Sequence, residues 1–176
     1  MTLQDQIKQT IRDVYDFPKP GIVFKDISTI MLDPILSNAI LNHLEETYKS
    51  MGLDAVAGIE SRGFLFGYPL AMRLGIPFVL IRKAGKLPYK KISYDYELEY
   101  GNATIEMHTD AVKEGMNVLI HDDLLATGGS AAAAAQLILK SGGNVAGFNF
   151  LVALNFLGGN ERLKHISDNI INFVEY

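Results

Sequence analysis

Cysteine is absent from the 176 residues of this sequence, and no apolar run approaches the roughly 20 residues that span a membrane. Without cysteine, a disulfide framework, a thiolate zinc site and a cysteine nucleophile are all excluded. The polar N-terminus of mixed charge does not match a secretory signal. We therefore expect a cytoplasmic protein that makes no use of a membrane.

An excess of positive charge is also missing. The 16 Lys and Arg residues are outnumbered by 20 Asp and Glu, which leaves a net charge of −4. A general nucleic-acid binder would need a basic face, so we expect no nucleic-acid partner, and any anion site must be local. The four histidines are scattered without metal-ligand spacing, so no structural zinc is expected.

Apolar residues that recur at helical spacing predict a first helix through Leu3, Ile7, Ile11 and Val14. A second helix should begin after Asp33, an N-cap residue that is followed by Pro34. Short apolar runs then predict buried strands at residues 55–59, 78–81, 118–120, 145–152 and 170–174. Helical patterns at residues 64–74 and 130–140 alternate with them, and residues 103–107 could add an antiparallel strand. The pattern indicates an α/β fold with a mostly parallel central sheet flanked by helices.

The most informative segment follows the apolar run at 118–120. Asp122 and Asp123 come first, and residues 126–130, here called the phosphate loop, read Ala-Thr-Gly-Gly-Ser before the next helix. Glycines, hydroxyl donors and a helix N-terminus together form a cradle for a phosphate group. The two carboxylates suit neighbouring sugar hydroxyls, or a divalent cation bound directly or through water. A ribose 5-phosphate satisfies both requirements, whereas the alternative is a plain strand-to-helix turn.

Two further segments carry positive charge. Residues 60–63, here called the arginine loop, place Arg62 between an apolar run and a helix, where it suits a second phosphate or pairs with a surface acid. Five basic residues lie within residues 82–91, and the first part of this stretch, residues 82–88, is here called the basic turn. Such a cluster either stabilises a departing pyrophosphate or forms a solvated surface. The Tyr-rich segment 89–100 has little periodicity, which is typical of a mobile lid.

Residues 122–129 resemble the phosphoribosyl-pyrophosphate signature of the type I phosphoribosyltransferases, in the form found in members that use adenine. The segments at residues 17–27, 58–67, 82–88 and 97–101 are similar to that family's pattern in the same order. The resemblance implies the type I phosphoribosyltransferase fold as a single domain over residues 1–176, with a small hood at 1–34 and a core at 35–176. It also implies transfer of the phosphoribosyl group from phosphoribosyl pyrophosphate to adenine, which gives AMP and pyrophosphate in purine salvage.

The resemblance also assigns roles to individual residues. Those implied for the phosphoribose are Asp122, Asp123, Ala126, Thr127, Gly128, Gly129 and Ser130. Those implied for the pyrophosphate are Ser61, Arg62, Lys83 and Lys86, with a Glu60–Ser61 peptide that is commonly cis. Glu99 is the implied acid facing the purine, and the catalytic set is Glu99, Arg62, Lys83 and Lys86. Ser93 and Tyr94 belong to the flexible loop, and the implied adenine contacts are Val23, Phe24, Lys25 and Leu154.

The family further implies Mg²⁺, held mainly through the substrate with no direct protein ligand assigned, and a homodimer. Lys25 departs from the Arg that is usual at its position, and Ala153 stands where an acid is frequent. Two other functions stay open at this stage. One is transfer to hypoxanthine, guanine or xanthine, and the other is a non-catalytic sensor of phosphoribosyl pyrophosphate that regulates transcription.

Overall fold

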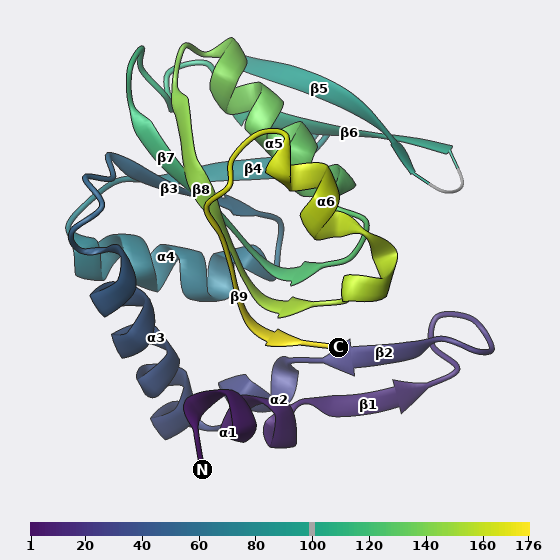
Figure 1. Cartoon of the computed structure of the whole chain (residues 1–176). Helices are drawn as coiled ribbons and strands as arrows, with labels where there is room; N and C mark the ends of the chain where they lie inside the picture. Colours follow the sequence, from purple (N-terminus) through teal and green to yellow (C-terminus); the bar gives the residue numbers. More distant parts are fainter. Residues whose placement is uncertain (99–100) are drawn as a thin grey trace. The chain divides into compact units, whose positions relative to one another are not determined.

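The computed structural model describes residues 1–98 and 101–176 of the chain (Figure 1). The chain divides into two compact units, residues 1–47 and residues 48–176. Within the described residues, no helix has both the length and the apolar character needed to cross a membrane.

The first unit contains a two-stranded antiparallel sheet and three helices. Its elements are α1 (Leu3–Thr10), β1 (Arg12–Tyr15), β2 (Val23–Asp26), α2 (Ser28–Met31) and α3 (Pro34–Tyr48). The start of α3 is confirmed, because the Asp33 carboxylate accepts hydrogen bonds from the backbone N–H groups of Ile35 and Leu36 at 3.0 and 2.9 Å.

The prediction of one helix from Leu3 to Val14 is wrong at its C-terminal end. The helix α1 ends at Thr10, and Val14 lies in β1 opposite Phe24. The registers Arg12–Asp26 and Asp13–Lys25 place opposite charges across the two strands, and both pairs form ion pairs, at 3.3 and 2.7 Å. Cross-strand pairing of this kind favours a hairpin over continued helix, although the apolar spacing fits either.

The second unit is built on a seven-stranded sheet in the order β5-β6-β4-β3-β7-β8-β9 (Figure 1). The strands are β3 (Ala55–Ile59), β4 (Phe78–Lys83), β5 (Lys91–Leu98), β6 (Gly101–His108), β7 (Asn117–Leu125), β8 (Asn144–Ala153) and β9 (Ile170–Glu175). The five strands from β4 to β9 in this order pair in parallel, whereas β6 pairs antiparallel with both β4 and β5. The predicted fold class is therefore confirmed, and so is the antiparallel strand over 103–107.

Helices cover both faces of this sheet. They are α4 (Gly63–Leu74), α5 (Gly129–Lys140) and α6 (Gly159–Lys164), with a short 3-10 helix η1 (Asn155–Leu157) before α6. Alternate residues of β7 show the two faces, since Ile120 belongs to the core beneath α5 and His121 lies against Gly67 of α4. The small side chains of residues 131–135 are nearly all buried and let α5 lie close to the sheet.

The Tyr-rich segment predicted to be a mobile lid contains a regular edge strand, and its role as a lid stays a prediction. Residues 91–98 pair as β5 with β6 along their full length. Ile92, Tyr94 and Tyr96 pack partly buried against the core, and the residues between them are exposed. This is the period of two that a half-buried strand requires, and charged residues between the tyrosines concealed it.

Candidate active site

The two acids of the central motif lie within β7 rather than after it. The strand predicted to end at Ile120 continues to Leu125, because β8 pairs with it as far as Leu125 and Ala153. Consecutive side chains of a strand point to opposite faces, so the two carboxylates have different surroundings. Asp122 lines the hollow formed by the phosphate loop and also lies close to Gly63 of the arginine loop, whereas Asp123 pairs with Arg62.

A hollow of about 90 Å³ lies at the start of α5, which is well above the ~10–15 Å³ that one water molecule needs on this measure. Its lining consists of Asp122, Leu124, Leu125, Ala126, Thr127, Gly128, Gly129, Ser130, Ala131 and Phe150. The structure thus brings six of the seven residues implied for the phosphoribose around one small hollow, and Asp123 is not part of this lining. The size and the N–H groups at the helix N-terminus suit one phosphate group.

Glycine at position 128 is required by the backbone. Gly128 is the N-cap of α5 with φ of 76°, a left-handed conformation that side chains rarely adopt. A Cβ added there would also lie 3.1 Å from the carbonyl oxygen of Gly159 in α6. On the other side of the loop, the Ser130 hydroxyl lies 3.1 Å from the Tyr96 hydroxyl of β5. The phosphate loop is therefore held between α6 and β5.

Asp123 is 4% exposed and forms an ion pair with Arg62, with 2.8 Å between Oδ2 and Nε. Burial raises the pKa of Asp123, while the Arg62 guanidinium opposes the rise. Burial and the charge of Asp123 raise the pKa of Asp122 well above its usual value. Arg62 thus pairs with a buried acid of the motif. From the sequence alone, the alternative to binding a second phosphate was an ion pair with a surface acid.

The arginine loop meets the central motif closely. A Cβ on Gly63 would lie 2.9 Å from the carbonyl oxygen of His121 and 3.0 Å from Oδ1 of Asp122. The Glu60–Ser61 peptide is cis, as the resemblance implies. Glu60 also accepts a hydrogen bond from Nε of Arg82 in β4 at 2.9 Å, which joins this loop to the basic turn.

Within the basic cluster, some charges are paired and others are not. Arg82 pairs with Glu60, and Lys91 pairs with Glu106 at 2.9 Å. Lys83 and Lys86 are exposed, and no described acid lies within 4 Å of either ammonium group. Their charges are therefore available to an anionic ligand.

Comparisons with known proteins agree with this geometry. The phosphoribosyl transferase domain matches residues 34–174 of the chain. An adenine phosphoribosyltransferase of Cytophaga hutchinsonii is 49% identical over 174 residues, which cover 99% of this chain and 96% of that protein. The chain belongs to the adenine phosphoribosyltransferase family. It is therefore a transferase of the type I phosphoribosyltransferase fold.

Solved structures of this family superpose on nearly the whole chain. The enzyme of Thermoanaerobacter pseudethanolicus has a TM-score of 0.94 at 47% identity, covering 99% of this chain and all of that one. The enzyme of Saccharomyces cerevisiae, solved with adenine and an imino-altritol bisphosphate, has a TM-score of 0.90 at 38% identity, and 98% of each chain is covered. The family resemblance drawn from the motifs is thus confirmed.

The structure gives the positions of several other residues predicted for this phosphoribosyltransferase site. Val23, Phe24 and Lys25 lie in β2 of the first unit, and Leu154 follows β8 in the second unit. Ser93 and Tyr94 lie in β5, opposite Glu106 and Ile105 of β6. Glu99 lies outside the described residues. The roles of all these residues stay predictions.

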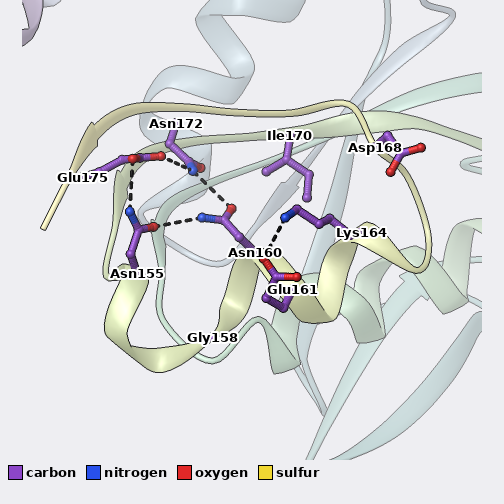
Figure 2. Close-up of a pocket in the computed structure, with 9 residues that line it drawn as sticks. All are labelled: Asn155, Gly158, Asn160, Glu161, Lys164, Asp168, Ile170, Asn172 and Glu175. Carbon is purple, nitrogen blue, oxygen red and sulfur yellow. Dashed lines mark hydrogen bonds and ion pairs between the residues drawn. The ribbon is translucent and has the colours of Figure 1, made fainter.

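Sequence reasoning missed a group of side chains behind the phosphate loop of this phosphoribosyltransferase. It is here called the amide ring, and its members are Asn155, Asn160, Asn172 and Glu175. Four hydrogen bonds of 2.9–3.1 Å close the ring, which lines a hollow of about 370 Å³ (Figure 2). The ring connects η1 and α6 to β9. Because its members come from three separate elements, no spacing in the sequence predicts it.

Proposed function

We propose that this protein transfers the 5-phosphoribosyl group from phosphoribosyl pyrophosphate to adenine, with AMP and pyrophosphate as products in purine salvage. The observation that carries the proposal is the hollow at the start of α5, where the phosphate loop and Asp122 converge. Family membership supports it, because relatives at 49% and 48% identity are adenine phosphoribosyltransferases.

Four segments bind different parts of the substrate: the phosphate loop, the acid pair, the arginine loop and the basic turn. The backbone and hydroxyl groups of residues 127–130 hold the 5-phosphate at the N-terminus of α5. Asp122 and Asp123 accept hydrogen bonds from the ribose hydroxyls, and Asp122 is the nearer to the phosphate loop. Ser61, Arg62, Lys83 and Lys86 bind the pyrophosphate.

In the reaction, a ring nitrogen of adenine forms a bond to C1 of the ribose while the bond from C1 to the pyrophosphate oxygen breaks. The sugar passes through an oxocarbenium-like state, as in other glycosyl transfers. Positive groups beside the pyrophosphate gain strength as its charge develops, and fixed binding of the 5-phosphate keeps C1 in line. Glu99 holds or exchanges the purine ring proton as the new bond forms.

Mg²⁺ fits this arrangement as a cation bound mainly by the substrate. Among the described residues, no group of three or more carboxylate, imidazole or thiol side chains is placed to hold a metal. Mg²⁺ in such sites takes one or two carboxylates together with phosphate oxygens and waters. The partly exposed Asp122, which lines the hollow, would be the carboxylate that contributes a ligand, and a bound cation would neutralise charge on the pyrophosphate.

Adenine is the proposed base, and the family resemblance implies Val23, Phe24, Lys25 and Leu154 as the residues that contact it. The Saccharomyces cerevisiae relative was crystallised with adenine. An amino group at the purine 6-position donates a hydrogen bond where a 6-oxo group accepts one, so the polarity of these contacts selects the base.

A homodimer in the cytoplasm is the proposed state of the protein. Leu65, Tyr68 and Met72 are 47%, 53% and 65% exposed and share one face of α4, which is the kind of apolar stripe that a second copy covers. Light scattering gives the mass in solution, and a monomer at micromolar concentration would contradict the proposal. The absence of cysteine suits a reducing compartment.

The decisive experiment mixes the protein with phosphoribosyl pyrophosphate, Mg²⁺ and each of adenine, hypoxanthine, guanine and xanthine, and identifies the nucleotide formed. We expect AMP from adenine and little product from the 6-oxo purines. A matched variant that combines Asp123→Asn with Thr127→Ala should lose turnover and keep its circular dichroism spectrum. Wild-type turnover in that variant, or a preference for a 6-oxo purine, would refute the assignment, and tight binding of phosphoribosyl pyrophosphate without turnover would favour a sensor.

A further inference from the structure

Arg162 of α6 stands beside the phosphate loop. Its Nη1 lies 3.3 Å from the point where a Cβ on Gly129 would sit, and that point is 3.5 Å from Cδ2 of Tyr96. Arg162 also lines a groove of about 360 Å³ together with Gly129 and residues 94–97 of β5. The guanidinium and the Tyr96 ring of the edge strand therefore both approach Gly129, the first residue of α5. Gly129 lines both this groove and the hollow proposed to hold the 5-phosphate, whereas Arg162 lines the groove alone, so the guanidinium stands one residue away from that hollow.

No acidic side chain in the described part of the chain neutralises the charge of Arg162. Across residues 1–98 and 101–176, no carboxylate lies within 4 Å of its guanidinium, whereas Lys164 of the same helix pairs with Glu161 at 2.7 Å. Arg62, the other arginine near the motif, pairs with Asp123. Arg162 is thus the arginine near the phosphate loop whose charge a bound anion could use.

The helix that carries Arg162 is fixed in place. Leu163 is fully buried, and the backbone N–H of Arg162 donates to the carbonyl of Gly158 at 3.2 Å. The side chain of Asn160 belongs to the amide ring, which ties this helix to β9 (Figure 2). Gly159, the first residue of α6, packs against the backbone carbonyl of Ala126, and a Cβ on Gly159 would collide with that carbonyl oxygen. The guanidinium therefore projects from a base whose position relative to the phosphate loop is set by packing.

We propose that Arg162 is a further phosphate-binding residue, which supplies a side-chain positive charge to the 5-phosphate dianion. The phosphate loop itself offers N–H groups, hydroxyl groups and the partial charge of a helix N-terminus, but no formal charge. A planar guanidinium binds phosphate oxygens through two parallel hydrogen bonds, which a lysine ammonium does not reproduce. The inference rests on the proposed function, because that function places a phosphate in this hollow.

The test compares Arg162→Gln and Arg162→Lys with the wild type, and Lys164→Gln is the matched control because it removes one charge from the same helix. With adenine saturating, we expect Arg162→Gln to raise the KM for phosphoribosyl pyrophosphate about five- to tenfold, the range for one exposed charge-assisted contact. The value of kcat should change less than about twofold, because a contact to the 5-phosphate is made equally before and during the reaction. Arg162→Lys should recover part of the loss, and Lys164→Gln should match the wild type.

A binding measurement separates this inference from the proposed function. Titration calorimetry with ribose 5-phosphate needs no turnover, and Arg162→Gln should weaken its binding by a factor similar to the rise in KM. The loss should shrink when KCl is raised from about 0.1 to 1 M, where the screening length falls from about 10 to 3 Å. An AMP-forming enzyme whose Arg162→Gln variant binds ribose 5-phosphate as the wild type does would overturn the inference alone. If no AMP forms but Arg162→Gln still weakens ribose 5-phosphate binding, the proposed function fails and the phosphate contact stands.

Discussion

His121 should make the protein sensitive to acid. Its side chain is fully buried in β7, directly before the acid pair. Its Nδ1 lies 2.7 Å from Oδ1 of Asn149, and the Asn149 amide nitrogen donates to the carbonyl of Ile171. That second bond fixes the amide orientation, so Nδ1 of His121 carries the proton of the neutral ring. Burial lowers the pKa of His121 to about 4, and the bond to Asn149 offsets part of the effect.

The sign and size of the pH effect follow from linkage. An unfolded histidine has a pKa of about 6.5. Between pH 6.5 and 4, His121 is therefore protonated in the unfolded chain but stays neutral in the folded chain. Stability is therefore full above pH 6.5 and falls as the pH drops. The shift from 6.5 to about 4 corresponds to about 3 kcal/mol in full, of which about 2 kcal/mol should be lost between pH 7 and 5.

Two neighbouring carboxylates act in the opposite sense. The raised pKa values of Asp122 and Asp123 mean that the folded chain binds protons there more readily than the unfolded chain, which favours folding as the pH drops. The Tyr48 hydroxyl is also buried, and its pKa is raised away from this range. The pH dependence of the wild-type unfolding free energy therefore combines contributions from His121 and from the two carboxylates. In the difference between wild type and His121→Gln, the carboxylate contributions cancel to first order.

The assay is urea unfolding of both proteins at pH 7, 6 and 5, followed by circular dichroism. We expect the free energy of unfolding of the wild type to fall relative to His121→Gln by about 2 kcal/mol from pH 7 to 5. Equal pH dependence of the two proteins, or an NMR titration that puts the His121 pKa near 6.5, would refute the reasoning.

Two further substitutions test local geometry. Gly63→Ala places a Cβ 2.9 Å from the His121 carbonyl oxygen, so it should cost about 1–3 kcal/mol in urea unfolding and lower turnover at least tenfold; a fully active variant would show that the arginine loop is not pressed against β7. Asp33→Ala removes the cap of α3 and should cost about 1 kcal/mol in unfolding free energy, whereas Asp33→Asn should retain most of it; equal losses in the two variants would contradict the capping role.

Much of the second unit could be predicted because its strands and helices have clear hydrophobic patterns within short segments of sequence. The run Ala55–Ile59 coincides with β3, and the helical pattern at 130–140 differs from α5 by one residue. Prediction failed where charged residues broke up the pattern, as in β5, and where β7 carried its acids inside the strand. In β1, helical spacing and strand pairing fit the same residues, and the cross-strand ion pairs with β2 favour the strand.

The site residues show the same division. The composition of the phosphate loop predicted its position at a strand-to-helix turn, and the structure places it there, between β7 and α5. Its phosphate-binding role stays a prediction. The ion pair of Arg62 with Asp123 could not be read from the sequence, since it depends on the parallel register of β3 against β7 across 61 positions of chain. The amide ring and Arg162 depend likewise on where α6 packs.

The order of strands brings the groups proposed for the pyrophosphate and the phosphoribose to one edge of the sheet, in an order that suits one extended substrate. In the run β4-β3-β7-β8, the carboxyl ends carry in turn Lys83, the arginine loop, the acid pair with its phosphate loop, and Leu154. These strands are parallel, so their loops leave from one edge of the sheet, about 4.8 Å apart per strand. Going from β4 to β7, the edge therefore presents the cations of Lys83 and Arg62 first, then the carboxylates of the acid pair, and then the N–H donors of the phosphate loop. A sugar with pyrophosphate at one end and a monophosphate at the other has that same sequence of anion, hydroxyls and anion, so its proposed direction across the sheet runs from β4 toward α5.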